Sequence, residues 1–98
     1  MYARVATFEG ADSERAREEG QRRLDSGQTP PGMKGYLYLA DPDSRRGVFI
    51  TFFDRREDIE AAESAFEQMG DEIPEDVRGR RTSRDYYEVL GSQIPALV

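Results

Sequence analysis

The chain has 98 residues, which is the length of a single domain. Only 37% of the residues are hydrophobic and 35% are charged, with 14 basic residues against 20 acidic ones and a formal charge of −6. A negative surface disfavours nucleic acids and anionic membranes as partners. The absence of cysteine excludes disulfides and thiol chemistry, which fits the reducing cytoplasm.

No stretch approaches the ~18 consecutive apolar residues that a membrane-spanning helix needs. The N-terminal segment Met1–Val5 lacks the charged and apolar regions of a signal peptide. The sequence therefore predicts a cytoplasmic protein with no membrane partner.

The N-terminal segment predicts a strand over Tyr2–Glu9. Alternation along this strand puts Arg4 and Phe8 on one face, and Val5 and Thr7 on the other. One of these faces is expected to meet the helices that follow.

A weakly amphipathic helix is expected next. Asp12 or Ser13 can cap its N-terminus, and the helix runs to about Leu24. Its inward stripe is limited to Ala16, Gly20 and Leu24, so this helix offers little apolar surface for packing.

Two unbroken apolar runs follow the loop Asp25–Gly32, and they predict strands over Lys34–Ala40 and Gly47–Phe53. The short turn Asp41–Ser44 contains proline at its second position, which predicts an antiparallel hairpin. Unbroken apolar strands are typical of sheets covered on both faces. Because 98 residues supply helices for only one face, we expect a second copy of the chain to cover the other.

The C-terminal half predicts a helix over Arg55–Ile73. Asp54 and Glu57 resemble a capping box at its start, and Pro74 ends it. Its apolar residues recur every three or four positions and form one inward stripe, which consists of Ile59, Ala62, Phe66, Met69 and Ile73.

The chain is then expected to continue as a polar connector, Glu75–Gly79, and a last strand, Arg80–Leu90. We expect residues 1–90 to form one domain, followed by an apolar tail, Gly91–Val98. An apolar tail on a polar chain is expected to dock on another surface, and the partner copy is one candidate.

The predicted order, strand–helix–strand–strand–helix–strand, is that of the ferredoxin-like α+β fold. Right-handed crossovers place both helices on one face of an antiparallel sheet and leave the other face bare. Two such sheets packed face to face would bury the apolar strands. The sequence therefore predicts a homodimer.

Four short segments, in this order and spacing, resemble those of the dimeric α+β barrel proteins grouped with the antibiotic-biosynthesis monooxygenases. The segments are Tyr2–Val5, Pro31–Gly35, Ile50–Asp54 and Tyr87–Val89. The resemblance extends over nearly the whole chain. It implies a homodimeric barrel with helices outside and a ligand cavity between the helices and the sheet of each protomer.

The chain also departs from the family's pattern. Met33 stands where the family usually has Phe, and Phe53 where it often has Trp. Haem-degrading members use an Asn on the first strand, where this chain has Ala3, and a Trp and a His on the second helix. The chain contains no Asn, Trp or His, so no haem and no other cofactor is expected. Of the residues that the family's quinol oxygenases use, only Tyr and Arg remain.

Without His or Cys, a zinc site or a Ser–His or Cys–His nucleophile is not expected, and acid–base catalysis falls to Asp, Glu or Tyr. The acidic clusters lack a defined ligand loop, so we expect no metal site and interpret them as a solvated surface.

The candidate catalytic residues are Tyr86, Arg84 and Tyr38. Arg84 and Tyr86 share a face of the last strand, and a cation beside an apolar cavity favours the anionic form of a phenolic substrate. The structural alternative is that the tyrosines bury their rings and leave their hydroxyls at the rim.

Phe66, Met69 and Thr7 are the candidate lining of a substrate pocket. Phe66 and Met69 belong to the inward stripe of the second helix, and such a stripe is also typical of plain core.

Two functions remain open. The first is a cofactor-independent monooxygenase that acts on a small aromatic or quinol-type molecule. The second is a non-catalytic homodimeric module that binds a small ligand or a protein, which the missing Asn and Trp residues favour. Arg46–Phe52 resembles an RNA-recognition signature, but the net charge of −6 provides no basic footprint for phosphates.

Overall fold

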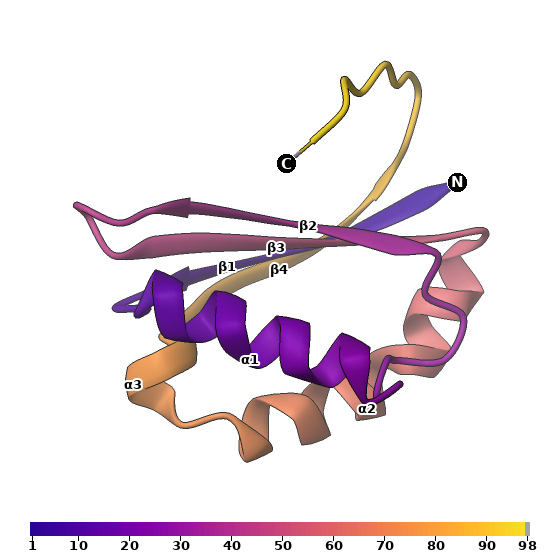
Figure 1. Ribbon diagram of the computed structural model, residues 1–98. Helices are drawn as coiled ribbons and strands as arrows, with labels where there is room; N and C mark the ends of the chain where they lie inside the picture. The colour runs from indigo at the N-terminus through magenta and orange to yellow at the C-terminus, as the bar shows by residue number, and fades with distance from the viewer. Residues whose placement is uncertain (98) are drawn as a thin grey trace.

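In the computed structural model, which describes residues 1–97, helices cover one face of a four-stranded antiparallel sheet (Figure 1). The strand order is β2-β3-β1-β4. The ferredoxin-like α+β fold predicted for the protomer is confirmed. The elements are β1 (Tyr2–Glu9), α1 (Ser13–Asp25), β2 (Gly35–Asp41), β3 (Arg46–Phe53), α2 (Arg56–Glu72), α3 (Glu75–Arg78) and β4 (Arg80–Glu88).

Two predictions for the second half of the chain are wrong. The segment expected to be a polar connector contains α3, a single helical turn with a buried Val77. The residue before α2 is Arg55, in an extended conformation and without a side-chain capping bond, so Asp54 and Glu57 form no capping box. Arg55 instead pairs with Asp58 one turn further on, at 3.1 Å.

The Pro31–Gly35 segment contains a tight turn that leads into β2. The amide of Met33 donates to the carbonyl of Pro30 at 3.3 Å, and Gly32 has a φ of 80°. Proline followed by a residue with positive φ matches a type II turn, and glycine adopts that conformation without steric cost. The turn places Met33 against the core around Phe53.

The apolar core lies between α2 and the sheet. Phe53, Ile59, Ala62 and Phe66 are buried together, and Met69 packs against them. The rings of Phe53 and Phe66 meet edge to face, with centroids 6.2 Å apart. The inward stripe predicted for the second helix is thereby confirmed at these positions.

The first helix covers the rest of the same face but packs loosely. None of the residues of α1 is buried, and its inward stripe of Ala16, Gly20 and Leu24 is only half-buried. Asp12 caps the helix, as predicted, by accepting from the amide of Arg15 at 3.2 Å. Alanine and glycine are too small to fill the distance to the sheet, so space remains beneath the helix.

Polar contacts hold α1 at both ends. Arg15 pairs with Asp76 of α3 at 3.2 Å, and Arg23 pairs with Glu72 of α2 at 2.9 Å. The amide of Asp12 also donates to the carbonyl of Val77 at 3.0 Å. The position of α1 therefore depends on its ends more than on its middle.

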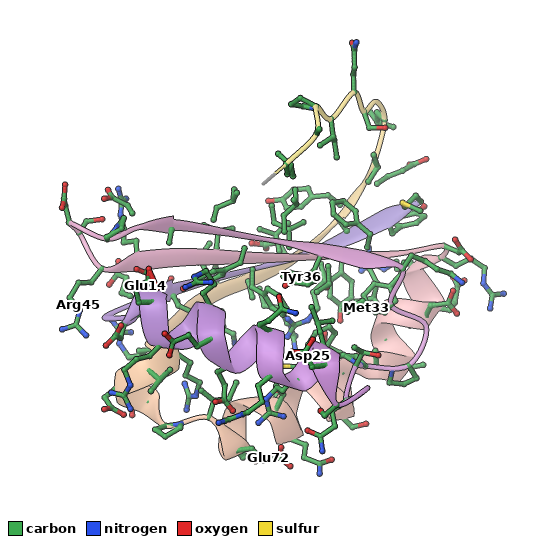
Figure 2. The ribbon with its side chains drawn as sticks, viewed as in Figure 1. Glu14, Asp25, Met33, Tyr36, Arg45 and Glu72 are labelled. Carbon is green, nitrogen blue, oxygen red and sulfur yellow. The ribbon has the colours of Figure 1, made fainter. Side chains whose placement is uncertain are left out.

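The other face of the sheet carries apolar side chains that no helix covers (Figures 1 and 2). Leu39 and Tyr87 are 51% and 56% exposed. The chain after β4 rises on this side of the sheet, with Leu90 and Ile94 also exposed. Val98, the last residue of the predicted tail, lies outside the described residues. Within residues 1–97, no helix combines the length and apolar character that crossing a membrane requires.

We predict that Gly79→Ala destabilises the protein by about 2–3 kcal/mol. Gly79 has a φ of 79°, and a Cβ there would lie 2.6 Å from the carbonyl oxygen of Glu9 and 2.9 Å from the amide nitrogen of Ala11. Because these neighbours are backbone atoms, relieving the overlap would require a backbone shift, which costs free energy. Urea denaturation measures the change. Gly91→Ala, whose Cβ would meet no atom within 4 Å, is the matched control, and equal stability of the two variants would contradict this packing.

Candidate functional site

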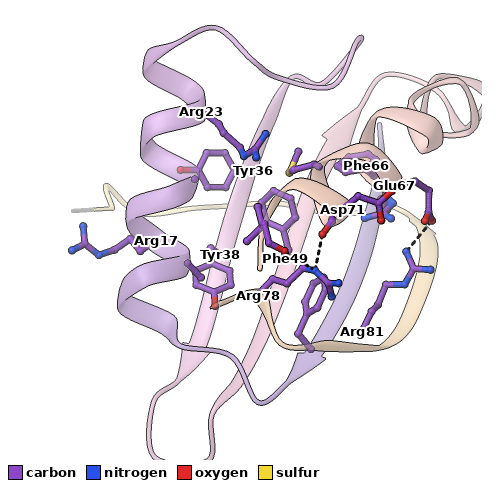
Figure 3. Close-up of a pocket in the computed structure, with 17 residues that line it drawn as sticks. Arg17, Arg23, Tyr36, Tyr38, Phe49, Phe66, Glu67, Asp71, Arg78 and Arg81 are labelled. Atoms are coloured by element: carbon purple, nitrogen blue, oxygen red, sulfur yellow. Dashed lines mark hydrogen bonds and ion pairs between the residues drawn. The ribbon is translucent and has the colours of Figure 1, made fainter. Parts of the chain in front are cut away.

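A cavity of about 390 Å³ lies between α1, α2 and the sheet (Figure 3). This volume is within the usual range for small-molecule sites, about 300–1,000 Å³. The strands contribute Arg4, Phe8, Tyr36, Tyr38, Phe49 and Arg81. The helices and the segment after α2 contribute Ala16, Arg17, Gly20, Arg23, Phe66, Glu67, Met69, Gly70, Asp71, Ile73 and Arg78.

Small residues on the helices create this cavity. A Cβ added to Gly20 or to Gly70 would meet no atom within 4 Å. On the sheet side the wall is aromatic, with the ring centroids of Tyr36 and Phe49 5.7 Å apart. Phe66 of α2 extends this wall, with its ring centroid 6.5 Å from that of Phe49. The site therefore offers a wall of tilted aromatic rings opposite an open helix face.

The ring of Tyr38 lies against β3 because residue 47 is a glycine. A Cβ on Gly47 would be 2.8 Å from the Tyr38 hydroxyl and 3.2 Å from the ring. Burial, followed by the negative charge of Asp12, raises the pKa of Tyr38. At neutral pH this hydroxyl is therefore a neutral hydrogen-bond donor rather than a base.

Arg4 is a buried charge in the cavity wall, with 2% of the residue exposed. Its guanidinium carbon lies 4.0 Å from the centroid of the Phe66 ring, and its Nε donates to Glu63 Oε1 at 2.5 Å. The other oxygen of Glu63 accepts from Arg84 Nη1 at 2.7 Å. A cation this far from water depends on such a partner, and the face of the Phe66 ring adds a weaker attraction.

Burial by itself would raise the pKa of Glu63, but the hydrogen bond and charge of Arg4, followed by Arg84 and Tyr86, outweigh it and hold the pKa below its usual value. Burial, the charge of Glu63 and a hydrogen bond to it raise the pKa of Tyr86. Arg4 and Arg84 carry two positive charges and Glu63 one negative charge. The group therefore has one net positive charge beside the cavity.

Three of the six candidate residues from the sequence line the cavity, namely Tyr38, Phe66 and Met69. Thr7 lies on the opposite face of the sheet, where its hydroxyl contacts that of Ser83 and where it borders a second hollow. The structure therefore does not bring Thr7 together with the other two pocket candidates.

Arg84 and Tyr86 project from one face of β4, as alternation predicts, and both interact with Glu63. Neither side chain is part of the cavity wall. Their link to the cavity runs through Glu63 to Arg4, so any effect on a ligand is indirect.

Sequence reasoning missed the arginines of the cavity wall, among them Arg23 and Arg78. Arginine is so frequent in this chain that no single one stands out. Helical spacing could have found Arg23, because it follows Ala16 by seven positions and Gly20 by three, and so lies on the inward face of α1. No comparable signal marks Arg78, which lies in the segment predicted to be a connector.

No family model matches the chain, and no curated protein has a matching sequence. Solved structures do match. The "Putative antibiotic biosynthesis monooxygenase from Nitrosomonas europaea" aligns with a TM-score of 0.64 and 16% identity over 91% of this chain and 89% of that chain. A monooxygenase from the gene ActVA-Orf6 of Streptomyces coelicolor, in complex with Nanaomycin D, aligns with a TM-score of 0.62 and 13% identity over 97% and 92%.

A third structure, of MhuD with manganese protoporphyrin IX bound, aligns with a TM-score of 0.65 and 15% identity over 97% of this chain and 100% of that chain. Identities at this level show a shared fold and no more. The protomer thus has the fold of the antibiotic biosynthesis monooxygenase proteins, as the resemblance of the sequence segments predicts.

The residues around this cavity do not fit a haem group. The chain has no His and no Cys, which are the commonest axial ligands. Tyrosine ligates haem iron in some proteins, but burial and the charge of Asp12 raise the pKa of Tyr38 and disfavour its phenolate. The cavity is better suited to an organic molecule held by ring contacts and arginines.

We predict that Glu63→Gln lowers the free energy of unfolding at pH 7 by about 3 kcal/mol, because it leaves the buried Arg4 without its counter-charge. Since the pKa of Glu63 is lowered from 4.5 in the folded protein, its contribution is complete above that pH and is lost as the pH falls through the lower folded value. The difference between wild type and variant should therefore shrink in acid.

Urea denaturation from pH 7 to pH 3 measures this difference. Glu60→Gln is the matched control on α2, because its pairing with Arg56 is exposed and 3.5 Å long, and we expect it to change stability by less than about 0.5 kcal/mol. Equal effects of the two substitutions would show that the Arg4–Glu63 pair has no special role.

Proposed function

We propose that the protein is a cofactor-independent, monooxygenase-like enzyme that binds an aromatic or quinol-type molecule in the cavity beneath α1. The observation that carries this proposal is the cavity itself, because its volume of about 390 Å³, its aromatic wall and its arginines suit an oxygen-bearing ring. The fold similarity to a monooxygenase solved in complex with Nanaomycin D supports it.

A phenol-type substrate can react with O₂ without a bound cofactor once it is ionised, because the electron-rich anion itself reduces oxygen. The ring loses its hydroxyl hydrogen and one ring hydrogen and gains one oxygen atom to form a quinone. The second oxygen atom leaves as water with those two hydrogens. The task of the protein is then to bind the ring, exclude water and favour the anion.

The charges of the site suit that task. Arg4, Glu63 and Arg84 together carry one net positive charge, which lowers the pKa of a substrate hydroxyl held nearby. Tyr38 is a neutral donor that can orient the substrate oxygen. In this proposal Phe66 and Met69 shape the pocket.

Arg84 and Tyr86 are positioning residues in this proposal. Both interact with Glu63, which in turn fixes the guanidinium of Arg4. Their substitution would act on the substrate through Arg4 rather than by direct contact.

The second candidate function is a homodimeric binding module without catalysis. The raised pKa values of Tyr38 and Tyr86 favour it, because neither hydroxyl is suited to act as a base at neutral pH. The absence of Asn and Trp from the chain favours it as well. Both candidate functions use the same cavity as a binding site, and only the enzyme converts its ligand to a product.

We predict oxygen consumption with at least one member of a panel of quinols and anthrones, measured with an oxygen electrode. Tyr38→Phe should lower kcat by about 10- to 100-fold, because it removes one hydrogen bond to the substrate oxygen. Tyr87→Phe, on the opposite face of the sheet, is the matched control and should leave the rate unchanged. Binding of the same compounds without any oxygen uptake would favour the binding module.

We predict that the protein is a homodimer through the bare face of the sheet, with a mass by light scattering of twice the protomer's 11.2 kDa. Ile50 is paired with Val5 and Leu37 in the sheet, and Ile50→Asp should shift the mass toward that of the protomer by placing a charge in this interface. Ser64→Asp on the exposed surface of α2 is the control. A monomeric wild-type protein at micromolar concentration would contradict the prediction.

A further inference from the structure

The cavity wall is rich in arginine, although the chain as a whole is acidic. The chain carries a formal charge of −6, whereas the wall contains five arginines and only two acidic residues. The two acidic residues are Glu67 and Asp71. An arginine of such a wall that lacks a carboxylate partner, or has only a weak one, can bind an anionic ligand.

Three of the five arginines are paired with carboxylates or extend away from the cavity. Arg4 is held by Glu63. Arg23 pairs with Glu72 at 2.9 Å and with Glu19 at 3.6 Å. Arg17 extends away from the cavity on the outer side of α1 (Figure 3).

Arg78 differs because it has no carboxylate partner within ion-pair distance among residues 1–97. Its Nε donates to the carbonyls of Gly70 at 2.8 Å and Ile73 at 3.2 Å, and its Nη1 donates to the carbonyl of Gly79 at 2.8 Å. These bonds fix the guanidinium at the C-terminal end of α2 and leave N–H groups available. The arginine is thus held in place before any ligand binds.

Arg81 is the second arginine of this part of the wall. It projects from β4 opposite Phe8 of β1, and its partner Glu67 lies 3.4 Å away with both side chains substantially exposed. An exposed ion pair of this length is weak, so a ligand carboxylate can compete for it. Arg78, Arg81 and Phe8 all line the cavity, and Phe8 is the neighbour of Arg81 across the sheet.

We propose that the ligand of this cavity is a flat aromatic molecule that carries a carboxylate, with the carboxylate bound by Arg78 and Arg81. The ring lies on the aromatic wall beside Phe49 and Tyr38, and the space beneath Gly20 accommodates it. This inference rests on the proposed use of the cavity as a ligand site and adds the class of ligand.

The experiment compares anthracene-2-carboxylate with its neutral analogue, anthracene-2-carboxamide, in fluorescence titrations. The two compounds have nearly the same shape and differ in charge. A charge-assisted bond to arginine should make the carboxylate bind about 10- to 100-fold more tightly at low salt. Raising the NaCl concentration should reduce that preference, because salt screens the attraction.

Three single substitutions test the assignment of the carboxylate site. Arg78→Gln and Arg81→Gln should each weaken binding of the carboxylate at least fivefold and leave binding of the carboxamide unchanged. Arg81 is exposed, so its variant remains informative if loss of Arg78 disturbs the end of α2. Arg80→Gln is the matched control, because Arg80 pairs with Glu9 outside the cavity.

Gly20→Leu tests whether the compounds occupy the cavity or the bare face of the sheet. The new side chain enters open space beneath α1 and should weaken binding of both compounds at least tenfold. Equal affinities of the two compounds, or binding that Gly20→Leu leaves unchanged, would overturn the assignment. If neither compound binds, the assignment also fails, and oxygen uptake with uncharged quinols decides the proposed enzymatic function separately.

Discussion

A helix that presents only alanine and glycine to a sheet cannot fill the space beneath it. Helix α1 presents Ala16 and Gly20 to the sheet, and the space beneath them stays open. The consequence is an unfilled volume in the middle of a domain whose other half, around Phe53 and Phe66, is well packed. Contacts at the two ends of α1, to Glu72 and to α3, keep the helix over this volume. The cavity therefore follows from the amino acids on one helix face, and the proposed function depends on it.

The second constraint is electrostatic. Arg4 is buried on a central strand, and a buried guanidinium requires a partner, which Glu63 supplies from α2. Glu63 also binds Arg84, so two strands and one helix are joined at a single carboxylate. The same group contributes positive charge to the cavity. Structural stability and the ligand preference proposed for the site thus depend partly on the same side chains.

Much of the fold could be predicted because its signals are local. The apolar runs predicted the strands, the turn Asp41–Ser44 predicted the hairpin, and the stripe from Ile59 to Phe66 predicted α2. Each element lies at nearly its expected bounds. The single turn of α3 was missed because Val77 is its only buried residue. The predicted capping box does not form. Arg55, the residue before α2, is extended, and its side chain pairs with Asp58.

The site was harder to predict because it depends on distances between segments remote in sequence. Helical spacing placed Phe66 and Met69 on the inward face of α2, and both line the cavity. Alternation put Arg84 and Tyr86 on one face of β4, but it could not reveal that Glu63 stands between them and the cavity. The position of the Arg78 guanidinium is fixed by hydrogen bonds to carbonyls at the end of α2. A sequence pattern cannot predict such bonds.

The central claim is that a small aromatic molecule binds between α1 and the sheet. The most direct test is to record amide chemical shifts by NMR while titrating the protein with 1-naphthol. The account predicts that the shifts change most at Gly20 and Gly70, which line the cavity, while Gly91 in the tail stays unchanged. Shift changes confined to the bare face, around Leu39 and Ile50, or no changes at all, would contradict it.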